Sequence, residues 1–216
     1  LVDAVLEGAR GDLHFVPVAI DYEKVVEGSS YKKELQGGEK QAEDIRGLLS
    51  APKVLAENYG RIHLRVNEPI ALKSLILERG LTVDESMPEE AKRQVVRALG
   101  NRVMFGISQV STVTPHALLS SALLAHRKRG ISGRELTERI VWLRKIATDL
   151  KAPFSSQLEN APSAPTVIGP VADAMRMFGQ QKFVRIIDTG ADPIFQVEDS
   201  TRLELSFYKN TLLNLV

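Results

Sequence analysis

The architecture of this chain can be read outward from one apolar run that ends in an acidic-aromatic turn, Phe15-Val16-Pro17-Val18-Ala19-Ile20-Asp21-Tyr22. Its β-branched residues favour a strand, and Pro17 cannot donate a ladder hydrogen bond, so residues 13–20 predict a buried strand near a sheet edge. Residues 27–38 have the Gly, Ser and Lys content of a loop, and residues 41–57 show helical spacing. Residues 61–66 alternate polar with apolar. The first 80 residues therefore predict a β-loop-α-β unit.

A helical region follows a polar connection over residues 82–90. Its signals are apolar residues spaced three and four apart, Pro88 and Thr114 at helix starts, and the capping-box pattern Ser132-x-x-Glu135. They predict helices over residues 88–110, 114–130, 132–150 and 167–179. A turn-forming segment between residues 183–187 and 194–197 predicts a β-hairpin. The chain thus predicts an α/β fold in two parts, residues 1–80 and 81–216.

Composition narrows the class of protein. The 216 residues are 44% hydrophobic and 25% charged, which is ordinary globular usage, and a net charge of +1 indicates no general field for nucleic acid. No cysteine is present, which excludes disulfides, thiolate chemistry and a Cys-based zinc site. No apolar stretch approaches the roughly 20 residues of a membrane-spanning helix. The chain begins at Leu1 without a signal-peptide pattern, and we expect it to begin inside a longer protein.

The search for catalytic groups finds no complete constellation. The four histidines have no metal-ligand spacing, so neither a metal nor a cofactor is predicted. His63 and Glu68 lie an odd number of residues apart on a strand, so their side chains point to opposite faces and His63 is interpreted as a strand-surface residue. His116 and His126 are interpreted as helix-terminus or surface groups. Gly106-x-Ser108 lacks the second glycine of a nucleophile elbow.

The loop from Glu27 to Lys40 is the remaining candidate for binding chemistry. Lys32, Lys33 and Lys40 lie close to Gly28 and Gly37-Gly38, and ammonium groups with unhindered backbone amides suit a phosphate. A surface loop of this composition without such a role is the more common object. Both interpretations stay open on composition alone.

A resemblance to a known family favours the binding interpretation of this loop. Val16-Pro17-Val18-x-Ile20 with Asp21-Tyr22 resembles the fourth motif of the glycerol-3-phosphate acyltransferases, V-P-V-x-I-x-Y-[DE], with the Asp here before the Tyr and Glu23 after it. The similarity continues through Glu27, Tyr31, Glu34-Leu35, Gly37-x-x-Lys40, Glu43, Asn58-Tyr59-Gly60 with residues 61–69, Leu123-Leu124, His126-Arg127, Gly130-Ile131 and Leu205-x-Phe207-Tyr208-x-Asn210. The resemblance covers almost the whole chain.

The resemblance implies transfer of an acyl group from acyl-CoA or acyl-carrier protein to the sn-1 hydroxyl of glycerol 3-phosphate, the first committed step of phospholipid biosynthesis. In that family a His-x4-Asp dyad is the general base and arginine-rich motifs hold the phosphate. Neither is present here. The chain would therefore be the C-terminal portion, inactive alone, with the end of an αβ acyltransferase domain over residues 1–80 and a mostly helical domain over residues 81–216. The implied substrate-binding residues are Val16, Pro17, Val18, Tyr22, Lys33 and Lys40.

Three alternatives accompany this reading. A dihydroxyacetone-phosphate acyltransferase shares the fourth motif. A DNA-binding winged helix has the same order of elements, but its recognition helix, near residues 165–179, offers Arg176 as its one cation, so no nucleic acid partner is expected. The excess of Lys and Arg over residues 127–151 fits either an anionic membrane surface or acyl carrier, or a solvated helical face. We expect the enzyme at the cytoplasmic face of a membrane.

Overall fold

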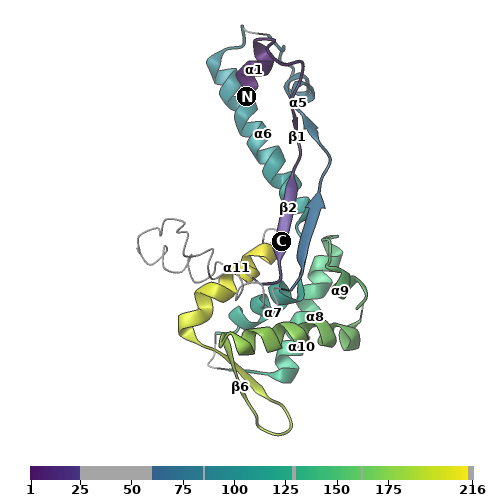
Figure 1. Ribbon diagram of the computed structural model, residues 1–216, viewed down its shortest axis with the longest axis vertical. Helices are drawn as coiled ribbons and strands as arrows, with labels where there is room; N and C mark the ends of the chain where they lie inside the picture. Colours follow the sequence, from purple (N-terminus) through teal and green to yellow (C-terminus); the bar gives the residue numbers. More distant parts are fainter. Residues whose placement is uncertain (25–59, 85, 128–129, 162, 214–216) are drawn as a thin grey trace, which may run out of the picture. The chain divides into compact units, whose positions relative to one another are not determined.

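The computed structural model describes residues 1–24, 60–84, 86–127, 130–161 and 163–213 (Figure 1). Its contacts divide the chain into two compact units. Unit 1 comprises Leu1–Ile20 and Leu64–Ser111, and unit 2 comprises Asp21–His63 and Thr112–Val216. Residues 81–111 thus pack with the N-terminal residues. The predicted division at residue 80 stays a prediction, and the predicted loop 27–38 and helix 41–57 lie outside the described residues.

Unit 1 is built around one long helix. Its elements are α1 (Val2–Leu6), β1 (His14–Phe15), β4 (Ile70–Ala71), α5 (Leu72–Glu78) and α6 (Glu89–Val110). β1 and β4 pair antiparallel, with Phe15 opposite Ile70. The apolar stripe of α6 packs through Val95 and Leu99 on α1 and α5, and Pro88 is the residue before its first turn, as predicted. This small core fixes the part of the chain on which the first candidate site lies.

Two longer strands, β2 (Val18–Tyr22) and β3 (Ile62–Val66), form a two-stranded ribbon (Figure 1). The Asn67 N–H donates to the Pro17 carbonyl (2.9 Å) and the Glu23 N–H donates to the Arg61 carbonyl (3.1 Å). These two bonds define an antiparallel register, in which Val18 lies opposite Val66 and Ile20 lies opposite Leu64. The strand near residues 61–66 is confirmed.

The first strand is not uniformly buried, contrary to the expectation for residues 13–20. Pro17 and Ala19 are buried, whereas Val18 and Ile20 on the other face are 39% and 48% exposed. The β3 residues opposite them, Val66 and Leu64, are 56% and 62% exposed. Successive side chains of a strand point to opposite faces, so one face of the ribbon is an open apolar surface. The prediction of one buried strand over residues 13–20 is therefore wrong: the segment forms two strands, β1 and β2, in different sheets, and one face of β2 is exposed.

Unit 2 surrounds a helix, α7, that is buried on almost all sides. Its helices are α7 (Pro115–Leu124), α8 (Gly133–Asp149), α9 (Ser156–Glu159), α10 (Ala164–Gln180) and α11 (Arg202–Leu213), with the 3-10 turn η1 (Asp199–Thr201) before α11. Residues 115–123 of this helix are all buried, including the polar His116, Ser120 and Ser121. α8, α10 and α11 pack around α7, and Phe178 and Leu205 are among the fully buried residues of this core.

The remaining elements of unit 2 form a three-stranded antiparallel sheet. β5 (Ile131–Ser132), β6 (Val184–Ile187) and β7 (Ile194–Val197) lie in the order β5-β7-β6, so the predicted hairpin is confirmed. The predicted caps are also present: Thr114 accepts from the Ala117 N–H (3.2 Å) and Ser132 from the Glu135 N–H (3.3 Å). The mixed helix and sheet confirms the α/β class. Sequence reasoning did not predict β5 or α11.

Candidate functional site

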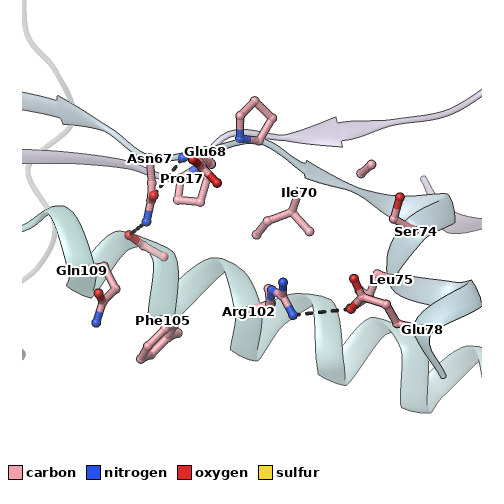
Figure 2. A pocket seen from close by; sticks show the side chains of 13 residues that line it. Pro17, Asn67, Glu68, Ile70, Ser74, Leu75, Glu78, Arg102, Phe105 and Gln109 are labelled. Carbon is pink, nitrogen blue, oxygen red and sulfur yellow. Dashed lines mark hydrogen bonds and ion pairs between the residues drawn. The ribbon is translucent and has the colours of Figure 1, made fainter.

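A hollow of about 420 Å³ in unit 1 brings together the fourth-motif proline and the Asn-Glu-Pro segment after β3 (Figure 2). Pro17 and Asn67 lie at one end, while Arg102 and Gln109 come from α6. The volume falls within the range of about 300–1,000 Å³ typical of small-molecule sites. Segments that lie far apart along the chain therefore meet in this hollow.

Close backbone approach shapes one wall of this hollow. The Asn67 side-chain Nδ2 donates to the Gly106 carbonyl (2.8 Å), and the Asn67 Oδ1 accepts from the Glu68 N–H (2.8 Å). A Cβ atom at Gly106 would lie 2.7 Å from the Pro17 Cγ, nearer than real Cβ atoms come to other atoms. Gly106, considered above only as part of a hydrolase motif, is thus the position that lets α6 approach Pro17.

The charges of the hollow suit a polar ligand. An Arg102 nitrogen lies 3.5 Å from a Glu78 oxygen, as Figure 2 shows, and both side chains are largely exposed, so this ion pair contributes little to stability. Glu68 is a second carboxylate in the lining. A phosphate would meet one guanidinium and two carboxylates, so the hollow by itself is not an anion site. Ser74, Gln109 and Asn67 can hydrogen-bond an uncharged polar group.

A second polar cluster lies in unit 2, where the Glu23 carboxylate is buried. One of its oxygens lies 3.4 Å from the His63 Nε2 and the other accepts from the Arg61 N–H (3.0 Å). With its amide oriented to satisfy both neighbours, Gln157 donates to Glu23 and accepts from Arg61 (2.9 Å each). The interpretation of His63 as a strand-surface residue is wrong, because its side chain is largely buried against this carboxylate. The cluster joins the ends of β2 and β3 to α9.

His116 and His126 lie at the two ends of α7, as the helix-terminus alternative predicted, but both are buried, so the surface alternative is wrong. The His126 Nε2 donates to the Gly130 carbonyl (2.8 Å), directly before β5. His116 packs against the rings of Phe178 and Tyr208. Burial lowers the pKa of His116 to about 4, with a smaller lowering by His63 and opposing effects of Glu23 and Asp173. His116 is therefore a neutral core residue rather than a general base for neutral pH.

No group of three metal-ligating side chains occurs among the described residues. Among the described residues, neither the Glu23 cluster nor His116 lines the hollow around Pro17. Neither of them lines a second hollow, which includes His126.

Comparison with known proteins assigns the chain to a family. Residues 31–216 match the family model described as the glycerol-3-phosphate acyltransferase C-terminal region. The chain belongs to the glycerol-3-phosphate acyltransferase family. A protein named glycerol-3-phosphate acyltransferase from Xanthomonas axonopodis pv. citri is 32% identical over 98% of this chain and 24% of its own length. Its namesakes from Xanthomonas campestris pv. campestris and Xylella fastidiosa M23 are 31% and 30% identical, over 24% and 25% of their lengths. This chain thus spans about a quarter of these acyltransferases.

The substrate-binding residues expected from the acyltransferase motif fall into three groups. Pro17 lines the hollow of Figure 2. Val16, Val18 and Tyr22 lie on the exposed apolar face of the ribbon, away from Pro17. Lys33 and Lys40 lie outside the described residues. Arg102 and Gln109 were not predicted as site residues, although their spacing of seven on α6 was a signal that they share one helix face.

Proposed function

We propose that this chain is the C-terminal portion of an enzyme that transfers an acyl group from acyl-CoA or acyl-carrier protein to the sn-1 hydroxyl of glycerol 3-phosphate in phospholipid biosynthesis. The family assignment over residues 31–216 and the names of the relatives support the proposal. The fourth-motif strand supports it independently, because Pro17 and the Asn67-Glu68 segment meet in one hollow. Dihydroxyacetone phosphate is the alternative acceptor.

The open face of the ribbon is the observation that carries the proposal. Val18 lies opposite Val66 and Ile20 opposite Leu64, and all four side chains are more than a third exposed. An isolated two-stranded ribbon with an uncovered apolar face is marginal in water. Such a face suits a strand pair that extends the sheet of a larger acyltransferase domain. Most of that domain would correspond to the three quarters of the relatives that this chain does not cover.

We further propose that the catalytic base and the arginines for the substrate phosphate belong to that other part. In the described residues of this chain the best-placed acid-histidine pair, Glu23 and His63, is buried in a network that includes Gln157. A buried and internally bonded pair is poorly placed to take a proton from a substrate hydroxyl. The 216-residue chain alone is therefore expected to be inactive.

A membrane-facing role is the second part of the proposal. Among the described residues no helix is both long and apolar enough to cross a bilayer. On α8 the Arg139 guanidinium pairs with Glu135 (2.7 Å), whereas Lys145 is exposed. Exposed cations of this kind, with Arg127 and Lys151 at the two ends of the segment, support peripheral contact with anionic lipid or an acidic acyl carrier at the cytoplasmic face.

The experiment measures lysophosphatidate formation from labelled acyl-CoA and glycerol 3-phosphate. We expect none from the chain alone and clear formation when the chain is joined to the preceding part of the enzyme.

A pair of variants of the joined enzyme tests the role of the ribbon. Val18→Asp is expected to lower the rate at least tenfold, because it buries a charge in the sheet, whereas Leu77→Asp, at an exposed residue of α5, leaves the rate unchanged. Activity of the chain alone, or a joined enzyme that acylates only dihydroxyacetone phosphate, contradicts the proposal.

A further inference from the structure

The open face of the β2–β3 ribbon does not by itself specify how the two strands are aligned. Its side chains are Val18, Ile20 and Tyr22 of β2 and Ile62, Leu64 and Val66 of β3. A shift of one strand by two residues would again place apolar side chains opposite one another on this face, so its packing selects no register. Residues 23–61 separate the strands in the sequence, a connection too long for a short hairpin turn to set the register.

The side chain of Glu23 takes part in the pairing, one residue beyond the end of β2. A hydrogen-bonded pair of residues in an antiparallel ladder normally exchanges two backbone bonds. Here the Glu23 N–H donates to the Arg61 carbonyl (3.1 Å), but the Arg61 N–H donates to the Glu23 carboxylate (3.0 Å). A carboxylate thus takes the place of a backbone carbonyl, so this pairing depends on which residue occupies position 23.

The surroundings of the Glu23 carboxylate fit it closely. Gly60 has a φ of +71°, and a Cβ atom there would lie 2.8 Å from the Glu23 Oε2. The other carboxylate oxygen accepts from the Gln157 amide (2.9 Å) and lies 3.4 Å from the His63 Nε2. Glu23 is only 5% exposed. A shift of β3 would carry Arg61 away and leave a buried carboxylate with fewer partners, which is costly.

The register also decides what surrounds Pro17. Asn67 lies opposite Pro17, and its N–H donates to the Pro17 carbonyl (2.9 Å) while its side chain donates to the Gly106 carbonyl (2.8 Å). A shift by two residues would move Asn67 about 7 Å along the ribbon, out of reach of the Pro17 carbonyl, and bring Arg65 or Pro69 opposite Pro17. The hollow around Pro17 therefore keeps this wall only in the observed register.

We infer that Glu23 is a positioning residue for acyl transfer, because its carboxylate fixes β2 on β3 in the register that sets Pro17 against Asn67. The inference rests on the proposed function, since the hollow around Pro17 serves a substrate only if the chain takes part in that reaction. Glu23 does not line this hollow, so it acts through the strand and not on a substrate. The acidic position of the fourth motif is thus assigned to strand alignment.

Engineered cysteines report the register directly, because the chain has none of its own. Ile20→Cys is combined with Leu64→Cys, which lies opposite, or with Ile62→Cys or Val66→Cys, two positions away in either direction. Opposite residues of this kind have Cα atoms about 4.5 Å apart, within disulfide range, whereas those of the displaced pairs are about 8 Å apart. On oxidation of the 216-residue chain, the opposite pair is expected to cross-link about tenfold faster than either displaced pair.

Two matched pairs of variants test the cause of that preference. Glu23→Met keeps the size of the side chain without its acceptors and is expected to reduce the preference to about twofold or less, whereas Glu23→Gln keeps an oxygen for the Arg61 N–H and preserves it. Gly60→Ala, which crowds the carboxylate, is expected to act like Glu23→Met. Its control is Gly8→Ala, at the same φ of +71° but with nothing within 4 Å of the added Cβ. Circular dichroism confirms that each variant folds.

Kinetics of the joined enzyme test the link to the reaction. Glu23→Met is expected to lower kcat about tenfold, and Glu23→Gln to stay within about twofold of the unmodified enzyme, whereas a role in proton transfer would make the uncharged amide inactive. The Ile20→Cys and Leu64→Cys disulfide holds the strands in the observed register, so it is expected to restore the rate of Glu23→Met. The unmodified enzyme with the same disulfide is the reference.

Cross-linking and transfer are measured separately, so the inference and the proposed function fail separately. An unchanged cross-linking preference in Glu23→Met overturns the inference, even if the variant is less stable. A lost rate that the disulfide does not restore also overturns it, and leaves the proposed function standing. A changed register together with no transfer by the unmodified joined enzyme rejects the proposed function and leaves Glu23 as a register residue only.

Discussion

The Asp21 carboxylate accepts a 2.7 Å hydrogen bond from the backbone N–H of Thr112, although the two residues lie 91 positions apart. Both residues are buried. Asp21 belongs to the acidic-aromatic turn with which the fourth-motif strand ends, and Thr112 belongs to the segment that leads into α7. This acidic residue of the acyltransferase motif is thus a structural hydrogen-bond acceptor inside unit 2.

Replacement of this acceptor is expected to destabilise unit 2. Asp21→Ala leaves the Thr112 N–H buried without this partner, which typically costs about 1–3 kcal/mol. Asp21→Asn keeps a side-chain oxygen in the same place and is expected to cost less than half as much. Urea unfolding followed by circular dichroism measures both variants. Equal losses for the two variants would contradict the assigned role.

The stability of unit 2 is expected to depend on the protonation of His116. The folded His116 stays neutral down to a pKa of about 4, whereas the unfolded side chain takes up a proton near pH 6.5. The unfolded state therefore binds more protons between these values, so the stabilisation is complete above pH 6.5 and is lost as the pH falls toward 4. The total effect is on the order of 3 kcal/mol.

His116→Leu is expected to remove that part of the pH dependence. The Nδ1 atom of His116 is buried without a hydrogen-bond partner among the described residues, so an apolar side chain of similar size fits the site between Phe178 and Tyr208. The free energy of unfolding is measured for both proteins at several pH values from 4 to 7.5. Parallel curves for the two proteins would contradict this assignment.

Two glycines of α6 provide a matched pair of variants. Gly106→Ala places a methyl group against the rigid Pro17 ring, with 2.7 Å between the Cβ and the Pro17 Cγ, and is expected to destabilise unit 1. Gly100→Ala meets nothing within 4 Å and is expected to stabilise the same helix by about 1 kcal/mol. Differential scanning calorimetry measures both. Stabilisation by both substitutions would show that Pro17 moves freely away from α6.

Arg144 is expected to be a structural cation rather than part of a lipid-facing surface. Its guanidinium donates twice to the Leu158 carbonyl (3.3 and 3.2 Å) and lies 4.8 Å from the centre of the Phe154 ring. Burial lowers the pKa of this guanidinium below its ordinary value. Arg144→Met is expected to cost about 1–3 kcal/mol of stability.

The exposed neighbour Lys145 is the control for that variant. Lys145→Met is expected to change stability by less than about 0.5 kcal/mol, because the side chain lies at the surface. If lipid contact uses α8, liposome co-sedimentation with anionic vesicles falls for Lys145→Met and not for a folded Arg144 variant. The reverse pattern would place the functional cation at Arg144.

Helices were predicted well where their signals are local. α6, α7, α8 and α10 were identified because apolar spacing and caps such as Thr114 and Ser132 act within a few residues. β5 was missed because it has only two residues, and its pairing with β7 depends on a partner more than 60 positions away. The burial of His63 was missed for the same reason, since its neighbour Glu23 lies 40 positions earlier.

The sequence by itself determined the α/β class, the helices α6, α7, α8 and α10, the β6–β7 hairpin and the acyltransferase family, since local periodicity and short motifs carry that information. Only the tertiary structure decided which side of the first strand is covered, that Pro17 faces Gly106 while Val18 faces outward, and that α8, α10 and the hairpin enclose an apolar groove. Register and packing join residues that are distant in sequence, and no local spacing specifies which of them meet.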